Sequence, residues 1–225
     1  MKSYTVYLIR HGMTDEGGEG RYIGHTDVPL SEEGRQQLIR LKDELVYPPV
    51  SAVFTSPLSR CTETAAILYP ENKAIAIDGL IEYDFGEFEN KTAEELKKSP
   101  VFPKWLAGEA DPPFGESNAA FAKRVCGSFE KILEGLMKTG TTDAAIITHG
   151  GVIMALLTLF GLPQAPMHEW LTPGGCGYTI RITPSLWSQG RKVEVIAQIP
   201  EVEGEKDSFG TDEDDDFNVE DYINN

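Results

Sequence analysis

Two histidines that are each followed directly by glycine are the residues of this 225-residue sequence best suited to chemistry. His11 lies in Leu-Ile-Arg-His-Gly-Met-Thr (residues 8–14), and His149 lies in Thr-His-Gly-Gly (residues 148–151). A neutral imidazole is a competent nucleophile toward phosphorus because its ordinary pKa, about 6.5, lies near neutrality. A second imidazole at the same group can donate a hydrogen bond and stabilise charge. The pair therefore predicts a site that accepts a phosphoryl group.

Two arginines can supply the positive charge that such a site needs. Arg10 directly precedes His11, and Arg60 follows an apolar run in Thr-Ser-Pro-Leu-Ser-Arg (residues 55–60). Guanidinium groups bind phosphoryl oxygens, and their charge favours the neutral form of a nearby imidazole. Arg60 lies near a predicted helix start, where the helix dipole adds positive character. A helix is also predicted to begin after His149, and the free backbone N–H groups expected there, at Gly150, can bind phosphoryl oxygens as well.

Cleavage of a phosphoester also needs an acid that protonates the departing oxygen and a base that activates water. One carboxylate can perform both tasks in turn. The segment 80–90 offers four candidates, and their chemistry alone does not choose among them: Glu82, Asp84, Glu87 and Glu89.

The elements that must position these residues follow from alternating apolar and polar runs. The predicted strands cover residues 4–9, 51–55, 74–77, 143–148, 178–183 and 192–199. Predicted helices start at the N-caps Ser31 and Ser56 and near Thr92, and two more cover 117–138 and 150–160. Strands that alternate with helices predict an α/β fold, a three-layer α/β/α sandwich around a mainly parallel, mixed sheet. In such sheets ligands bind outside the carboxyl ends of strands, where both histidine motifs fall.

Negative charge is concentrated at the C-terminal end of the sequence. The net charge is −16, of which residues 201–225 contribute −10 through eleven acids and one lysine. We expect one catalytic domain over residues 1–200, in which the variable segment 84–117 covers the cleft and sets specificity. Its aromatic residues are equally well explained as a satellite core. We expect the acidic tail at 201–225 to be disordered.

Several classes of function are disfavoured. The sequence has no basic stripe for nucleic acid and no apolar stretch of membrane-spanning length. Its histidines and cysteines lack metal-ligand spacing, so we expect neither a metal nor a cofactor. Three scattered cysteines indicate reduced thiols and a cytoplasmic protein. Nothing in the sequence predicts the oligomeric state.

Together these motifs resemble the histidine phosphatase superfamily, also called phosphoglycerate mutase-like. The matching blocks lie in the family's order at residues 8–14, 21–31, 56–60 and 148–151. The segment 84–89, with Thr92 and Gly-Glu-Ser at 115–117, is most similar to the small-molecule phosphatase branch that includes α-ribazole phosphatase.

The resemblance implies that His11 becomes a phosphohistidine while Arg10, Arg60 and His149 hold the phosphoryl group. It also implies that Glu82 is the proton donor, because the family's acid follows a strand end and precedes a segment like 84–89. The resemblance places three further residues in the substrate loop: Tyr22, Gly24 and Thr26. Family members usually carry an asparagine that contacts phosphate where this chain has Gly17, a departure that bears on rate and phosphate affinity.

These features predict a phosphomonoesterase that acts on a small phosphorylated metabolite. The first alternative is a 2,3-bisphosphoglycerate-dependent phosphoglycerate mutase. Such mutases carry a longer insertion between the acid and the second histidine, whereas Glu82 and His149 are only about 70 positions apart here. The second alternative is a weakly active or inactive phosphate-binding or adaptor protein, for which only Gly17 and the acidic tail argue.

Overall fold

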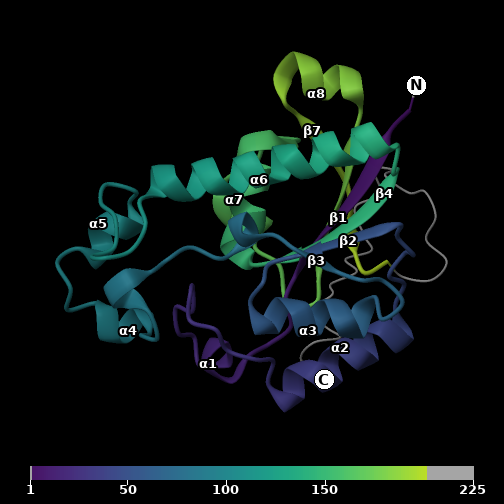
Figure 1. Ribbon diagram of the computed structural model, residues 1–225. Helices are drawn as coiled ribbons and strands as arrows, with labels where there is room; N and C mark the ends of the chain where they lie inside the picture. The colour runs from purple at the N-terminus through teal and green to yellow at the C-terminus, as the bar shows by residue number, and fades with distance from the viewer. Residues whose placement is uncertain (1, 202–225) are drawn as a thin grey trace, which may run out of the picture.

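The structure, a computed structural model, describes residues 2–201. In these residues strands alternate with helices and form three layers (Figure 1). The strands are β1 (Tyr4–Arg10), β2 (Ala52–Thr55), β3 (Ile75–Ala76), β4 (Asp143–Thr148), β5 (Gly161–Leu162), β6 (Gly177–Ile182) and β7 (Val193–Ile199). The α-helices are α1 (Asp15–Gly18), α2 (Glu32–Glu44), α3 (Ser59–Leu68), α4 (Ala93–Leu96), α5 (Phe102–Leu106), α6 (Asn118–Thr139), α7 (Gly150–Phe160) and α8 (Pro184–Gly190). Three short 3₁₀ helices are η1 (Asp78–Leu80), η2 (Gly86–Phe88) and η3 (Met167–Trp170).

A single sheet forms the middle layer of residues 2–201, with strand order β3-β2-β4-β1-β6-β7-β5. The pairs β3–β2, β2–β4, β4–β1 and β7–β5 are parallel, whereas β6 runs antiparallel to both β1 and β7. The predicted mainly parallel, mixed sheet is therefore confirmed. The largely buried strands β1 and β4 lie side by side near its centre.

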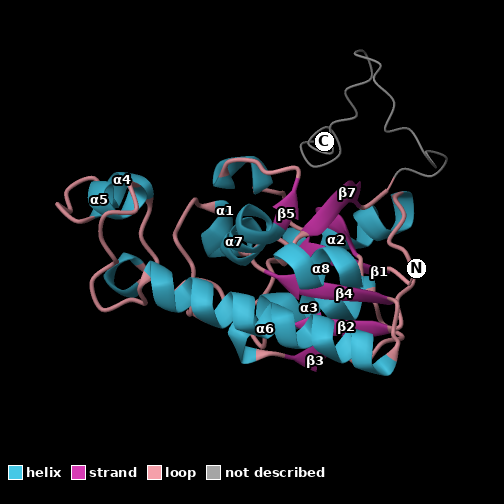
Figure 2. Ribbon diagram, turned by 90° about the horizontal axis from the view of Figure 1, so that it is seen from above, coloured by secondary structure: helices cyan, strands magenta, loops and turns pink. Residues whose placement is uncertain are grey.

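The two faces of the sheet are covered by different helices because side chains alternate along each strand. In β1, Val6 and Leu8 pack into the large core that α6 and α7 complete. On the opposite face, Tyr7 and Ile9 pack with residues of α2 and α3. Figure 1 shows α6 and α7 above the sheet and α2 and α3 below it, and Figure 2 shows α6 running roughly along the direction of β2 and β4.

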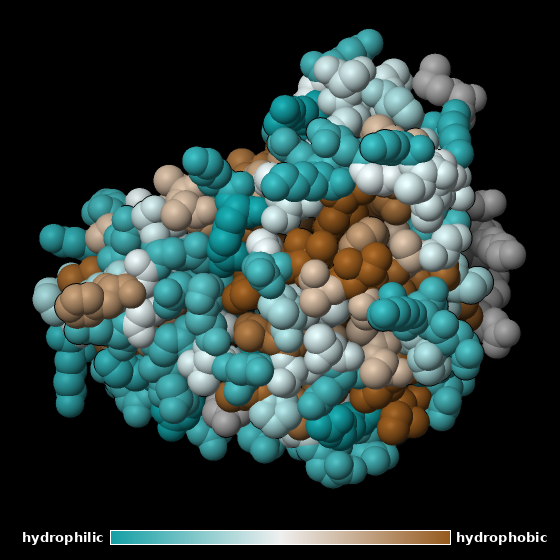
Figure 3. All heavy atoms as spheres, in the orientation of Figure 1, coloured by the Kyte–Doolittle hydropathy of each residue, from teal (hydrophilic) through white to brown (hydrophobic). Residues whose placement is uncertain are grey.

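The variable segment 84–117 forms a small lobe beside one end of α6, with α4 and α5 at its outer side (Figure 1). It has its own core of Phe88, Leu96 and Phe102, against which Phe85 and Trp105 pack. Phe114 is the exception, with 89% of its surface exposed. The satellite-core interpretation therefore holds for four of the five aromatic residues, and hydrophilic side chains cover much of the lobe in Figure 3.

Some elements differ from the sequence prediction. The glycine-rich segment at residues 16–20, which lies between the predicted strand at 4–9 and the predicted helix after Ser31, contains most of the short α1, in which the Gly17 amide donates to Thr14 Oγ1 at 3.0 Å. The two-residue β5 and the short α8 were not predicted, because neither is long enough to show a period. Helix α3 begins at Ser59, so the prediction that Ser56 is its N-cap is wrong.

The ordered fold reaches slightly past the predicted domain boundary at residue 200. The backbones of Val46 and Glu201 form an isolated bridge, with N–O distances of 2.8 and 3.0 Å. The predicted disordered tail lies, apart from Glu201, outside the described residues. Across residues 2–201, none of the helices has the length and apolar character that crossing a membrane requires.

Candidate active site

The two histidine motifs meet because the strands that carry them are neighbours. Arg10 of β1 is the register partner of Thr148 of β4, so the next residues, His11 and His149, leave the same edge of the sheet. The His11 backbone N–H donates to Thr148 O at 2.9 Å. The two imidazole rings lie with centroids 5.1 Å apart in an edge-to-face arrangement. Parallel pairing thus brings together residues 138 positions apart in the sequence.

The hydrogen bonds of His11 leave one ring nitrogen free for attack. His11 Nδ1 lies 2.7 Å from Gly12 O, and a carbonyl oxygen only accepts, so Nδ1 carries the proton. The lone pair of a neutral His11 is then on Nε2. The Gly12 N–H in turn donates to Thr64 Oγ1 of α3 at 3.0 Å, which fixes the turn after β1.

Arg60 is almost wholly buried, with 1% of its surface exposed, and joins three parts of the site. Its Nη2 donates to Gly24 O at 2.7 Å and its Nη1 to Thr26 O at 2.9 Å. Its Nε donates to His149 Nδ1 at 3.3 Å. Because a guanidinium has five N–H donors, two remain for an oxyanion. Arg60 therefore links the substrate loop to the second histidine.

His149 is completely buried and bonded at both ring nitrogens. Since Arg60 Nε only donates, Nδ1 accepts and the proton of a neutral His149 lies on Nε2, which is 2.8 Å from Ser56 Oγ. The Cys61 thiol also lies 3.5 Å from Nε2. Ser56 therefore positions His149, a role that the sequence analysis missed. Its place directly after β2, which pairs with β4, is the signal that could have found it.

Glu82 is the acid that lies inside the site. Its carboxylate accepts from the backbone N–H groups of Tyr83 and Gly151, both at 2.9 Å, and 8% of its surface is exposed. The second contact places Glu82 beside the start of α7, two residues after His149. A Cβ at Gly151 would lie 2.3 Å from Glu82 Oε1, so with any other residue at 151 the carboxylate would have to move from this position.

The other three acidic candidates have different surroundings. Glu89 accepts hydrogen bonds from the Gly24 and His25 amides and from Thr26 Oγ1, at 2.7–3.1 Å, and so braces the substrate loop. Asp84 accepts from the Gly86 amide at 3.0 Å, and Glu87 is exposed.

The remaining predicted residues are placed as follows. Arg10 donates through Nη1 to Thr172 O at 2.7 Å, and a Cβ at Gly150 would lie 3.5 Å from Arg10 Nε, so these two are adjacent. The Tyr22 ring packs in the satellite core, 5.3 Å from Phe85 and 5.4 Å from Trp105 between centroids. Gly24 and Thr26 are held between Arg60 and Glu89.

Burial and nearby charges lower the pKa values of His11 and His149, and burial raises the pKa of Glu82. Burial, together with the charges of Arg60 and Arg10, holds the pKa of His11 well below 6.5. The pKa of His149 is also well below 6.5, through burial first and then His11 and the two arginines. Burial raises the pKa of Glu82 above 4.5, although hydrogen bonds from two amides oppose this shift. The site therefore favours the neutral form of both imidazoles, and it moves the titration of Glu82 to higher pH than is usual for a glutamate.

A free imidazole nitrogen, two guanidinium groups and a carboxyl group at one edge of the sheet are the kinds of group that phosphoryl transfer uses. Over residues 2–201, no group of three or more His, Cys, Asp or Glu side chains is arranged to hold a metal ion.

Comparison with known proteins identifies the family to which the chain belongs. The sequence matches the histidine phosphatase superfamily (branch 1) over residues 6–192, and the chain belongs to that superfamily. This match confirms the expected enzyme class, a phosphoric monoester hydrolase.

Individual relatives agree with the family and with the predicted branch. The chain is 28% identical to the adenosylcobalamin/alpha-ribazole phosphatase of Salmonella typhimurium, over 79% of this chain and 90% of that protein. It is 31% identical to a 2,3-bisphosphoglycerate-dependent phosphoglycerate mutase of Gloeobacter violaceus, over 68% and 73% of the two chains. The crystal structure of the alpha-ribazole phosphatase from Shigella flexneri superposes with a TM-score of 0.73 and 26% identity, covering 90% of this chain and all (100%) of that one. The predicted phosphoglycerate mutase-like α/β sandwich is thus confirmed.

Proposed function

We propose that this enzyme hydrolyses a small phosphorylated metabolite through a phosphohistidine on His11, with Glu82 as general acid and then general base. One observation carries the proposal: His11, His149, Arg60 and Glu82 converge at the carboxyl ends of β1, β2 and β4. His11 offers a free Nε2 there, and the neighbouring carboxyl group is biased toward its protonated form.

In the first step the His11 Nε2 lone pair forms an N–P bond while the ester P–O bond breaks. Glu82 gives its proton to the departing oxygen, which leaves as an alcohol. Arg10 and Arg60 neutralise the phosphoryl oxygens during the transfer. His11 Nδ1 keeps its proton and donates it in a hydrogen bond to Gly12 O. This bond stabilises the positive charge that develops on the ring.

In the second step Glu82, now a carboxylate, takes a proton from water. The water oxygen attacks phosphorus, the N–P bond breaks, and its electron pair returns to His11 Nε2. Inorganic phosphate leaves, and Glu82 is again protonated, ready for the next substrate.

The covalent intermediate gives the direct test. A rapid alkaline quench of enzyme and p-nitrophenyl phosphate, followed by mass spectrometry, should locate a phosphoramidate on His11. His11→Ala should abolish turnover while retaining the circular dichroism spectrum of the native protein. The matched control is His168→Ala, because His168 is an exposed histidine of η3 that none of the proposed steps uses. Full activity of His11→Ala would contradict the proposal.

The similarity to a mutase supports a second candidate, return of the phosphoryl group to another hydroxyl of the substrate. Phosphorus NMR of 3-phosphoglycerate with the bisphosphate primer separates the two. Release of inorganic phosphate without isomerisation supports the hydrolase, and appearance of 2-phosphoglycerate supports the mutase.

A further inference from the structure

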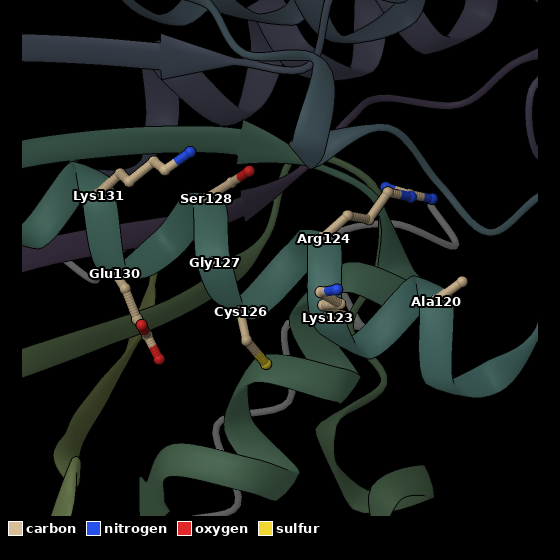
Figure 4. A pocket seen from close by; sticks show the side chains of 8 residues that line it. All are labelled: Ala120, Lys123, Arg124, Cys126, Gly127, Ser128, Glu130 and Lys131. Carbon is tan, nitrogen blue, oxygen red and sulfur yellow. The ribbon is translucent and has the colours of Figure 1, made fainter.

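Arg124, on α6, binds the backbone that carries Glu82. Its Nη2 donates to Glu82 O at 2.6 Å, and its Nη1 donates to Ile81 O at 2.5 Å and Gly79 O at 3.3 Å. In Figure 4 its side chain leaves α6 on the same side as Ser128, opposite Cys126. One guanidinium thus holds the carbonyl oxygens of Glu82 and of two residues just before it, Gly79 and Ile81.

Glu116 completes this arrangement from the other side. Its Oε2 accepts from Arg124 Nε at 3.0 Å, and its Oε1 accepts from both Arg124 Nη2 and the Asp84 backbone N–H, the latter at 3.0 Å. The Asp84 carbonyl accepts in return from the Glu116 N–H at 3.1 Å. We call the bonded pair of Arg124 and Glu116 the clamp.

The clamp therefore fixes the peptide groups on both sides of Glu82, through the carbonyls of residues 81 and 82, and it also holds the amide of residue 84. The Glu116 side chain is 14% exposed and that of Arg124 is 25% exposed, so the pair is shielded from water. Bidentate guanidinium–carboxylate bonding is directional, which makes the pair a suitable brace for a backbone segment. The Glu82 carboxylate itself has no contact with the clamp side chains among the hydrogen bonds of the described residues.

We infer that Arg124 and Glu116 are positioning residues that hold Glu82 in the orientation needed to protonate the leaving group. This inference rests on the proposed function of Glu82. It also gives the Gly-Glu-Ser segment at 115–117 a role, because Glu116 ties the end of the variable lobe to the acid.

The role has a signature that a purely structural role lacks. Protonation matters most when the leaving group is a basic alkoxide and least when it is a stable phenolate such as p-nitrophenolate. A misplaced acid therefore lowers kcat/KM far more for alkyl phosphates. Partial unfolding lowers kcat/KM equally for every substrate. The ratio kcat/KM is the right measure, because it reports on the step in which the leaving group departs, whereas kcat also contains hydrolysis of the phosphohistidine.

The experiment measures kcat/KM for p-nitrophenyl phosphate, phenyl phosphate and an alkyl phosphate with four variants. Arg124→Gln should lose on the order of 100-fold on the alkyl phosphate and less than about 10-fold on p-nitrophenyl phosphate. Glu116→Gln keeps the size of the side chain and should show the same trend, which maintains the test if Arg124→Gln does not fold. Glu82→Gln is the reference for complete loss of the acid. Arg191→Gln removes the ion pair between the exposed Arg191, at the end of α8, and Glu130 of α6, and its kcat/KM should stay within about 2-fold of the native value.

The outcomes distinguish the role of the clamp from the role of Glu82. A uniform loss in both clamp variants, beside a strongly leaving-group-dependent loss in Glu82→Gln, overturns the inference and leaves the proposed function intact. A uniform loss in Glu82→Gln overturns the proposed role of Glu82. In the double variant Glu82→Gln/Arg124→Gln, no further leaving-group dependence is expected beyond that of Glu82→Gln, because Arg124 acts through Glu82.

Discussion

Arg60 Nε donates to His149 Nδ1 at 3.3 Å, and this contact determines where His149 carries its proton. With Ser56 Oγ at 2.8 Å from Nε2, the ring is neutral and has both nitrogens bonded within the protein. To donate a hydrogen bond to a phosphoryl oxygen, as the sequence analysis expects, His149 must exchange its Arg60 contact for one to the anion. Nδ1 must then gain a proton.

This exchange predicts that anion binding is accompanied by proton uptake. The pKa of free His149 lies well below 6.5, and a bound dianion raises it by favouring the imidazolium. Titration calorimetry with tungstate, which remains a dianion at neutral pH, in buffers of different ionisation enthalpy should show uptake of about one proton per site. His11→Asn should retain the uptake, because His149 is the acceptor. Uptake that disappears in His11→Asn would assign the proton to His11 instead.

The pH profile follows from the opposite pKa shifts of nucleophile and acid. Attack requires neutral His11, and its lowered pKa extends activity to pH values below 6.5. Protonation of the leaving group requires protonated Glu82, and its raised pKa extends activity above 4.5. For an alkyl phosphate, kcat/KM should therefore fall as pH rises through the pKa of Glu82. This fall should be weaker for p-nitrophenyl phosphate, and an alkyl phosphate profile without an alkaline fall would contradict the assignment.

Stability should also depend on pH, through His11 and His149. Their folded-state pKa values are lowered, so the unfolded chain binds protons more readily. Below pH 6.5 the unfolded state gains protons that the native state does not bind, and the free energy of unfolding falls. The melting temperature should decrease as pH drops from 6.5, and replacing His149 with Asn should flatten this decrease. An unchanged slope in that variant would show that other groups govern the acid response.

The sequence was sufficient to place the residues at strand ends. His11, Arg60 and His149 each lie directly or soon after a buried apolar run, and parallel pairing of β1, β4 and β2 then brings them to one edge. Periodicity also predicted most elements to within a few residues, because long buried strands and helices have strong patterns. The choice of Glu82 needed the resemblance, since the four acids of residues 80–90 differ in surroundings that only the folded chain creates.

Contacts between distant segments could not be predicted in this way. Ser56 looked like a helix cap from its neighbour Pro57, but its hydroxyl faces His149, 93 positions away. Arg124 and Glu116 reach Glu82 only because α6 packs against η1, a docking that no local pattern encodes. Tyr22 was assigned to the substrate loop, and the aromatic lobe that surrounds its ring is visible only in three dimensions.

Ser56→Ala tests the second support of His149. The change leaves the buried Nε2–H without its acceptor, which should cost about 1–3 kcal/mol of unfolding free energy. It should also lower kcat/KM, because His149 loses the bond that fixes its ring. Cys61→Ala is the matched comparison, since its thiol lies 3.5 Å from the same nitrogen but is a weak partner. Thermal melts and kinetics check both variants, and equal effects of the two would contradict the role given to Ser56.

Gly151→Ala tests the close approach between α7 and the general acid. The added Cβ would lie 2.3 Å from Glu82 Oε1, so the carboxylate must move and lose its bond to the residue 151 amide. We expect kcat/KM for an alkyl phosphate to fall on the order of 100-fold, because small displacements of a reacting group are costly. Gly127→Ala is the control: in α6 a Cβ at Gly127 meets nothing within 4 Å, and alanine should stabilise the helix by about 0.5–1 kcal/mol. If Gly151→Ala remains as active as Gly127→Ala, Glu82 does not need the position in which the structure holds it.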